Sequence, residues 1–249
     1  MNTLLAVNIG NTTTTAGFFE GGALLRTIAA QTASLRSGED LPLGDERIRV
    51  AAIASVVDGL GAALAARLDR IAGEVLIFGR DIFAPIPSAV RNPESLGADR
   101  ILGAAAAFER FGGPVVAVDF GTAVTLNAVS GDGTFLGGAI APGLRMAAGA
   151  LAEGTSGLPE VEPEAPESAI GRDTDEAIRS GIVLGLAAMV DGMIGRMEEE
   201  LGGRVRAVAT GGDADAVAPH CRRIEATVRH LVLEGLRLAC ERSGRNDGG

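Results

Sequence analysis

The sequence predicts an α/β protein built from two related halves, and two observations carry this prediction. Short apolar runs of strand length alternate with longer runs in which apolar residues recur every three or four positions, as they do in helices. Residues 4–10 also return in similar form as residues 115–121, and in both copies β-type sequence and a glycine turn follow. A repeat of this length indicates a duplicated domain, with a first lobe over residues 1–112 and a second over residues 113–249.

The first lobe is expected to begin with strands joined by tight turns. Four consecutive threonines, residues 12–15, favour β structure, and Gly21 and Gly22 form a hairpin turn. The expected elements are strands over residues 4–7, 13–19, 23–27, 48–57 and 75–78, a polar loop over residues 32–45 and a helix over residues 61–71.

The rest of the chain is expected to continue with helices between further strands. The expected elements are helices over residues 98–111, 144–152 and 174–200, strands over residues 115–118, 135–141 and 205–209, and a proline- and acid-rich connection over residues 155–173. In the longest helix, apolar or small residues recur at Ile178, Ile182, Gly185, Met189, Met193 and Met197. This stripe predicts a face that packs in the core or against another subunit.

The composition excludes several kinds of chemistry. All 22 basic residues are arginine, so a P-loop lysine and Schiff-base chemistry are both excluded. Only two histidines are present, His220 and His230, which gives little support to a zinc site or a Ser-His-Asp triad. Carboxylates, hydroxyls, arginines and backbone amides remain, and these suffice for phosphoryl transfer.

Charge and hydropathy indicate where the protein works and what it binds. The net charge of −10 opposes binding to nucleic acid. No uninterrupted apolar run reaches about 18 residues, so no membrane span is expected. The N-terminal residues do not show the basic and then apolar pattern of a signal peptide. Cys221 and Cys240 are widely spaced thiols, which suit a reducing compartment, so we expect a cytoplasmic protein.

The clearest chemical signal lies where the second copy of the repeated strand ends. Asp119 follows an apolar run there, and Gly121 and Thr122 come next. A carboxylate at a strand end can hold a cation, and a glycine lets backbone N–H groups approach a phosphate closely. An Asp that only caps a turn is the alternative, but the matching turn after Asn8 in the first copy favours phosphate binding.

Two further turns carry candidate residues. Asp99 and Arg100 lie where an irregular segment meets a helix, so Asp99 could accept a proton from a hydroxyl and Arg100 could bind a carboxylate. A helix cap with a solvated arginine is the competing interpretation. Between a strand and a helix, Gly211 and Gly212 would let a base or ribose approach the backbone, or would form an ordinary turn.

Taken in order, these motifs resemble those of type III pantothenate kinases over roughly residues 4–241. The matching segments are IGNT at residues 9–12, Pro93, LGADR at 96–100, DFGTA at 119–123, GGAIAPG at 137–143, LP at 158–159, IG at 170–171, SG at 180–181, TGG at 210–212 and LEGL at 233–236. The resemblance implies an actin-like (ribonuclease H-like) fold, a homodimer, and transfer of the ATP γ-phosphate to pantothenate, the first step of coenzyme A synthesis.

The resemblance also implies roles for individual residues. Asp99 would be the proton acceptor, Asp119 would bind a monovalent cation such as K⁺ or NH₄⁺, and Mg²⁺ would accompany ATP. ATP would be bound by Asn8, Ile9, Gly10, Asn11, Thr12, Thr13, Thr14, Thr15 and Thr122. Pantothenate would be bound by Val90, Gly97, Ala98, Asp99, Arg100 and Thr174.

The sequence departs from the family pattern at a few of these positions. The family usually has Asp at the position of Asn8, Asn at that of Thr13, Tyr at that of Val90 and Asp at that of Asn127. An amide at position 8 keeps an acceptor oxygen and loses the charge that helps to position Mg²⁺. Two alternatives therefore stay open: a kinase-like protein that works by binding or regulation, and a kinase for another hydroxy acid.

Overall fold

The computed structural model describes residues 3–44 and 46–244, which group into two compact units. The first unit comprises Met1–Ala106 and Leu231–Gly249, and the second unit comprises Ala107–His230. The sequence placed the boundary between the halves after residue 112; by contacts, the C-terminal helix α8 (Leu231–Arg242) groups with the first unit. Helix α3 (Ala98–Phe111) contributes residues to both units.

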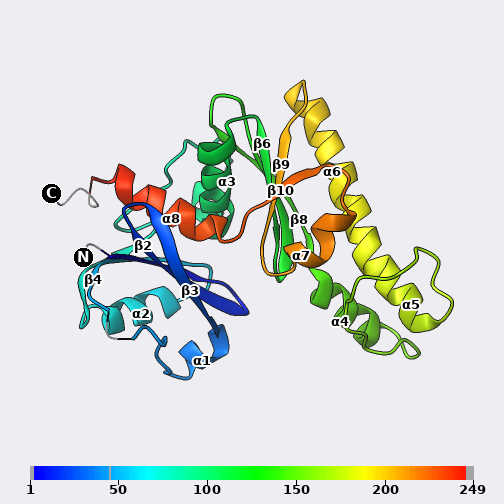
Figure 1. Cartoon of the computed structure of the whole chain (residues 1–249), viewed down its shortest axis with the longest axis horizontal. Helices are drawn as coiled ribbons and strands as arrows, with labels where there is room; N and C mark the ends of the chain where they lie inside the picture. The colour runs from blue at the N-terminus through cyan, green and yellow to red at the C-terminus, as the bar shows by residue number, and fades with distance from the viewer. Residues whose placement is uncertain (1–2, 45, 245–249) are drawn as a thin grey trace. The chain divides into compact units, whose positions relative to one another are not determined.

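Each unit contains one five-stranded mixed sheet, and the two sheets have the same topology (Figure 1). The first sheet has the order β3 (Ala23–Gln31), β2 (Thr13–Glu20), β1 (Thr3–Ile9), β4 (Ile48–Ser55), β5 (Ala72–Ile77). The second has the order β8 (Phe135–Pro142), β7 (Ala123–Val129), β6 (Val115–Phe120), β9 (Arg206–Thr210), β10 (Ile224–Thr227). In both, the first three strands are antiparallel and the last two pair in parallel. The predicted duplicated α/β fold is confirmed.

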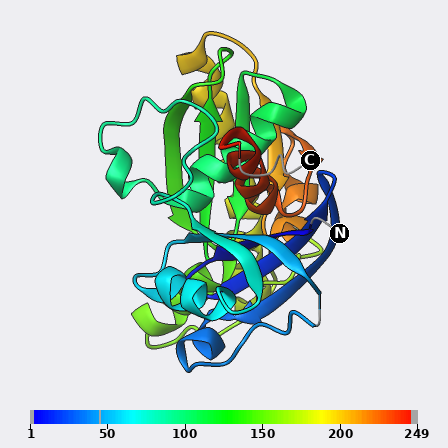
Figure 2. The same cartoon turned by 90° about the vertical axis from the view of Figure 1, so that its left-hand side faces the viewer.

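The first sheet is covered on both faces. Strand β1 sends Leu5, Val7 and Ile9 into a core under α1 (Thr32–Arg36) and α2 (Leu60–Leu68), while Leu4 and Ala6 face a second core with α3 and α8. Figure 2 shows α1 and α2 together on one side of this sheet. A central strand buried on both faces must be apolar throughout, which explains the unbroken apolar run at its start.

In the second unit, one face of the sheet packs against α4 (Leu144–Gly154), α6 (Gly185–Leu201) and α7 (Ala214–Val217). Strand β6 supplies Val116, Val118 and Phe120 to this core. Short helix α5 (Thr174–Arg179) leads into α6 through a π-helical turn, Ser180–Leu184. Turns η1 (Pro93–Ser95) and η3 (Ala218–His220) are 3₁₀ helices.

The π turn changes which residues of the long helix face the core. The buried core residues of this helix are Ile178, Ile182, Val183, Ala187, Val190 and Ile194, so the buried face moves on by one residue at the π turn. The expected stripe agrees with the structure at Ile178 and Ile182, and its residues Met189, Met193 and Met197 are partly buried and pack against the same core. The run Thr174–Leu201 reaches the length and mean hydropathy (1.6) of a membrane span, but helices of soluble proteins also meet this test, and a single such helix carries little weight.

Most expected elements are found with shifted ends, and a few elements differ from the expectation. The expected loop at residues 32–45 begins with helix α1; its last residue, 45, lies outside the described residues. Strand β3 extends four residues beyond the expected end, the helix expected after Asp213 is the short α7, and β10 and α8 were not expected from the sequence.

Candidate active site

The turn between β1 and β2 is tied together by hydrogen bonds inside the first unit. The N–H of Gly10 donates to the carbonyl of Thr13 at 3.1 Å. The hydroxyl of Thr32 donates to the Gly10 carbonyl at 2.8 Å, and the N–H of Thr32 donates to the Thr12 carbonyl, also at 2.8 Å. Residues 11–13 are exposed at the tip. The turn is therefore a fixed loop with an exposed edge, as a phosphate site requires.

Not every side chain of residues 8–15 can reach a ligand. Ile9 and Thr14 are fully buried, so only their backbones could take part. Asn8 is half-buried, and its Oδ1 atom is buried with no hydrogen-bond partner among the described residues. An unpaired buried acceptor is costly and marks a place where a donor or a cation is missing.

Asp99 sits in the first turn of α3, where its Oδ1 accepts the N–H of Arg100 at 2.8 Å. Burial raises the pKa of the Asp99 carboxyl, and the Arg100 N–H and charge oppose part of that rise. Burial likewise lowers the pKa of the Arg100 guanidinium, against the effect of Asp99. A Cβ at Gly97 would lie 2.7 Å from Asp99 Oδ1, so glycine there leaves room for the carboxylate. A carboxylate with a raised pKa is a better proton acceptor once ionised.

The second turn, after β6, is enclosed by glycines of neighbouring turns. A Cβ at Gly211, whose φ is +101°, would lie 2.4 Å from Asp119 Oδ1 and 2.4 Å from the carbonyl oxygen of Phe120. A Cβ at Gly143 would lie 2.2 Å from the Gly121 carbonyl oxygen. Three segments that are far apart in sequence therefore meet at the turn after β6, and only glycine allows the approach.

Asp213 extends this cluster. Its N–H donates to the Phe120 carbonyl at 2.9 Å, which ties the turn after β9 to the turn after β6. Burial raises the pKa of the Asp213 carboxyl, and the Arg145 guanidinium lowers it in part. The sequence had singled out the glycines before Asp213 for a base or ribose, and the structure brings them beside Asp119.

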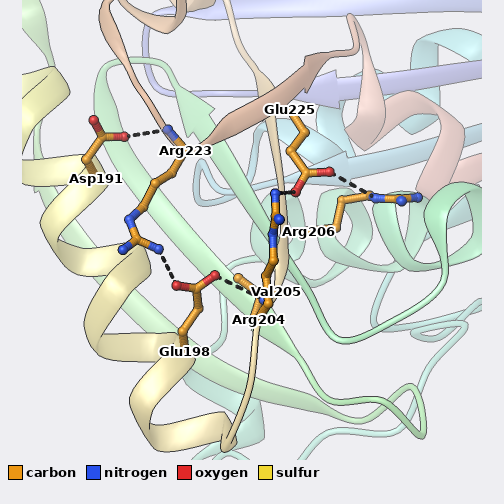
Figure 3. Close-up of polar contacts among 7 residues, drawn as sticks. All are labelled: Asp191, Glu198, Arg204, Val205, Arg206, Arg223 and Glu225. Carbon is orange, nitrogen blue, oxygen red and sulfur yellow. Dashed lines mark hydrogen bonds and ion pairs between the residues drawn. The ribbon is translucent and has the colours of Figure 1, made fainter.

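The segment that follows Gly212 is held at its C-terminal end, Arg222 and Arg223, by helix α6. The Asp191 carboxylate accepts the N–H of Arg222, at 2.8 and 3.0 Å, and the N–H of Arg223, at 3.0 Å. Figure 3 shows Asp191 and Glu198 on α6, with Glu198 paired to the Arg223 side chain and accepting the Val205 N–H at 3.2 Å. Sequence analysis missed Asp191, because a lone acidic residue on a helix gives no signal of its own.

Thr174 lines an open, mostly apolar groove of about 1070 Å³ in the second unit, between α4 and the helix that begins at Thr174. Asp173 caps that helix by accepting the Glu176 N–H at 2.9 Å, and Glu176 in return accepts the Arg172 N–H at 2.8 Å. Residues of both helices form the walls, such as Leu151 and Met189.

The remaining predicted residues lie between β5 and α3 or at the end of β6. Val90 is half-buried in the segment between β5 and α3, and its N–H donates to Ser88 Oγ at 3.4 Å. Thr122 is exposed and Asp119 is half-buried. Sequence analysis also missed Thr32, which it placed in a loop; a buried threonine at a strand end could have been recognised only from its partners.

The donor set fits a metal held mainly by a nucleotide. No group of three or more His, Cys, Asp or Glu side chains suited to a metal occurs in residues 3–44 and 46–244. The buried Oδ1 of Asn8 in the first unit and the carboxylate of Asp119 in the second are single oxygen ligands at strand ends. Mg²⁺ commonly takes one or two protein oxygens and completes its shell with phosphates and water, so the Asn8 oxygen fits it as a single protein ligand.

Sequence comparison finds relatives over nearly the full length of the chain. A type III pantothenate kinase from Anaeromyxobacter sp. (strain K) is 39% identical over 252 residues, covering 96% of this chain and 99% of the relative. One from Frankia alni is 37% identical over 248 residues, with the same coverage.

Solved structures show the same fold at low sequence identity. Component A of the (R)-2-hydroxyglutaryl-CoA dehydratase of Acidaminococcus fermentans superposes with a TM-score of 0.56 at 16% identity, covering 98% of this chain and 100% of that one. A ROK family glucokinase from Streptomyces griseus, solved with glucose and AMPPNP, gives a TM-score of 0.52 at 14% identity, with 96% and 100% covered. The fold is thus the actin-like one. Since the family model described as type III pantothenate kinase matches residues 4–196, this chain belongs to the type III pantothenate kinase family.

Proposed function

We propose that the protein transfers the γ-phosphate of ATP to the hydroxyl of pantothenate, the first step of coenzyme A synthesis. The observation that carries the proposal is Asp99, whose carboxylate is held beside Arg100 and has a pKa raised by burial. The relatives' names supply the substrate, and the fold is one that hosts kinases.

The proposed reaction is an in-line displacement. The substrate hydroxyl oxygen attacks the γ-phosphorus while its proton passes to the Asp99 carboxylate. The bond from the γ-phosphorus to the bridging oxygen breaks, and ADP leaves with that oxygen and its electron pair. Such a positioned base contributes a factor of about 10²–10⁴.

The turns of the two units have separate tasks. Residues 8–15 form the phosphate-binding turn, in which backbone N–H groups at the exposed tip bind phosphate oxygens, and Thr122 contributes its hydroxyl. Asn8 would hold Mg²⁺ and Asp119 a monovalent cation such as K⁺ or NH₄⁺. When bound with ATP, these ions offset the negative charge of the phosphates.

Arg100 gives the substrate pocket its charge, because a guanidinium can bind the pantothenate carboxylate with two hydrogen bonds. Gly97 and Ala98 precede it at the start of α3. Val90 offers an apolar contact at a position where the family usually has tyrosine. Thr174 reaches pantothenate from the groove of the second unit.

A homodimer is supported by the apolar groove beside Thr174. Large hydrophobic side chains are exposed at and near it: Met146 (48%), Leu151 (36%) and Ile170 (79%). Exposed apolar patches of this kind mark interaction surfaces, and a second copy of the same chain is the simplest partner. Leu151→Glu should shift the mass measured by light scattering to that of a monomer; an unchanged dimer would place the interface elsewhere.

The reaction uses small soluble substrates, and both cysteines suit a reducing compartment. Burial raises the pKa of Cys221 and of Cys240 to about 12, so neither is a ready thiolate. We infer a cytoplasmic location, with no nucleic acid or membrane partner.

The test is ADP release by the purified chain with ATP, Mg²⁺, K⁺ and pantothenate. We expect turnover that needs pantothenate and that Asp99→Asn abolishes, with ATP binding retained. Turnover retained in Asp99→Asn would overturn the assignment of the base. Asn8→Asp, run alongside, restores the charge that the family usually carries there.

Two other functions remain specific alternatives. If only Asn8→Asp turns over, the unpaired amide at position 8 indicates a protein that works by binding or regulation. If the wild type turns over with another hydroxy acid in a substrate panel and not with pantothenate, Val90 has changed the pocket.

A further inference from the structure

A pair of buried threonine hydroxyls lies directly behind the turn that connects β1 and β2. Thr14 and Thr32 are both fully buried, and their Oγ1 atoms are 3.0 Å apart. Thr32 comes from a distant segment, the first residue of α1 just after β3. Buried polar groups are as a rule hydrogen-bonded, and the Thr32 hydroxyl has contacts for both its donor and its acceptor capacity.

The direction of these hydrogen bonds follows from counting protons. The single hydroxyl proton of Thr32 is donated to the Gly10 carbonyl at 2.8 Å. Thr32 Oγ1 can then only accept from Thr14, so the Thr14 hydroxyl is the donor of that pair. The Thr32 N–H donates to the Thr12 carbonyl at 2.8 Å. One residue therefore holds two carbonyls of the turn.

Holding the carbonyls inward determines where the amides of the turn point. In a planar trans peptide, the C=O and the following N–H point in opposite directions. Since the carbonyls of Gly10 and Thr12 point toward Thr32, the N–H groups of Asn11 and Thr13 point away from it. Residues 11–13 are exposed, so an anion can reach the turn at its tip.

Gly10 makes this restraint necessary. Glycine rotates about its backbone bonds more freely than other residues, so the peptide between Gly10 and Asn11 is not fixed by its own sterics. The hydroxyl of Thr32 supplies the restraint. We propose that Thr32 is a positioning residue for ATP: its hydroxyl and N–H orient the peptides of residues 10–13 so that their amides bind phosphate. This inference rests on the proposed function, because that function places the ATP phosphates at this turn.

The test compares variants that differ at this hydroxyl alone. Thr32→Val keeps the shape and removes the hydroxyl, and Thr32→Ser keeps the hydroxyl. We expect Thr32→Val to raise the KM for ATP about tenfold, with the KM for pantothenate changed less than about twofold. Thr32→Ser should stay within about threefold of the wild type for ATP. If Thr32→Val does not fold, Thr32→Ala and Thr32→Ser form a second pair of nearly equal size.

Two controls separate positioning from stability. Thr3→Val removes a buried hydroxyl at the opposite end of β1, and Leu68→Ala makes a cavity in the core under α2. Both should leave the ratio of the two KM values unchanged, although Leu68→Ala lowers the unfolding temperature. An equal rise in KM for ATP in Leu68→Ala, or equal losses in Thr32→Val and Thr32→Ser, would overturn the inference.

The binding of Mg²⁺-ATP, measured by calorimetry, separates this inference from the proposed function. If the wild type phosphorylates no pantothenate, the proposed function fails. A dissociation constant raised about tenfold in Thr32→Val and not in Thr32→Ser would still support the role of Thr32. If the wild type binds no Mg²⁺-ATP, both fail together.

Discussion

The two strand-ending turns, residues 8–13 in the first unit and 119–123 in the second, occupy equivalent places in the same sheet topology and are stabilised differently. In the first, Gly10 pairs with Thr13 and a buried hydroxyl from Thr32 fixes the peptides. In the second, the Gly121 N–H donates to Ala123 at 3.2 Å, so the turn is one residue shorter.

In the second turn, backbone contacts take the place that the Thr32 hydroxyl has in the first. The N–H of Gly143 donates to the Thr122 carbonyl at 3.1 Å, and the Asp213 N–H donates to Phe120. The comparison teaches that one duplicated turn depends on a hydroxyl, while the other depends on glycines outside it. Substitutions should therefore act on the two turns in different ways.

The largest effect is expected at Gly143. A methyl group there would lie 2.2 Å from the Gly121 carbonyl oxygen and 2.5 Å from that of Thr122, so the backbone must move. Gly143→Ala should destabilise the protein by about 1–3 kcal/mol and reduce kcat/KM for ATP at least tenfold. Thermal unfolding and initial rates measure both.

Gly149 provides the matched control for that substitution. It lies in α4, six residues further on, and a Cβ there meets nothing within 4 Å. Gly149→Ala should be neutral or stabilise by up to about 1 kcal/mol. Equal unfolding temperatures for Gly143→Ala and Gly149→Ala would show that the second turn does not depend on its glycine neighbours.

The next prediction compares a glycine whose substitution should affect only ATP binding with one whose substitution should also affect stability. A Cβ at Gly121 would make ordinary contacts, 3.6 Å from the Ala123 carbonyl oxygen, whereas one at Gly10 would lie 2.9 Å from that of Thr13. Gly121→Ala should leave the unfolding temperature unchanged and raise the KM for ATP about tenfold, because the methyl group occupies the side a phosphate approaches. Gly10→Ala should lower both stability and ATP affinity. Unchanged ATP kinetics in Gly121→Ala would remove the second turn from the ATP site.

Sequence alone identified the turns but not what holds them. The repeated apolar strands predicted both turns, because a strand buried on both faces leaves a clear signal. Thr32 and Asp191 were missed, since their roles depend on partners that lie 18 and more residues away. The π turn Ser180–Leu184 was also missed, because such a turn has no reliable sequence signature.

A smaller effect is expected at Asp191, which anchors the segment after Gly212 only at its far end. Asp191→Ala removes the acceptor of the Arg222 and Arg223 N–H groups and should raise the KM for ATP about threefold. Asp191→Asn, which keeps one oxygen, should lie between. Glu200→Ala, at an exposed position of the same helix, is the control. A larger change in the KM for pantothenate than for ATP would contradict a role in the nucleotide turn.

The smallest effects are expected on stability, from one half-buried carboxyl in each unit. Burial raises the pKa of both Asp99 and Asp213 in the folded protein. Between the unfolded and the folded pKa, the folded state binds more protons than the unfolded state, so stability falls as the pH rises through this window. Above it, each ionised carboxylate carries the full cost of its burial.

Removing either charge should therefore stabilise the protein at pH 7. We expect Asp99→Asn and Asp213→Asn each to raise the unfolding temperature by about 1–3 °C at pH 7, with the difference from the wild type shrinking toward pH 3. The kinetics separate the two residues, because only Asp99 takes the substrate proton. In the wild type and in Asp213→Asn, kcat/KM should fall as the pH drops through the raised pKa of Asp99. Loss of this acid limb in Asp213→Asn would transfer the role of base from the first unit to the second.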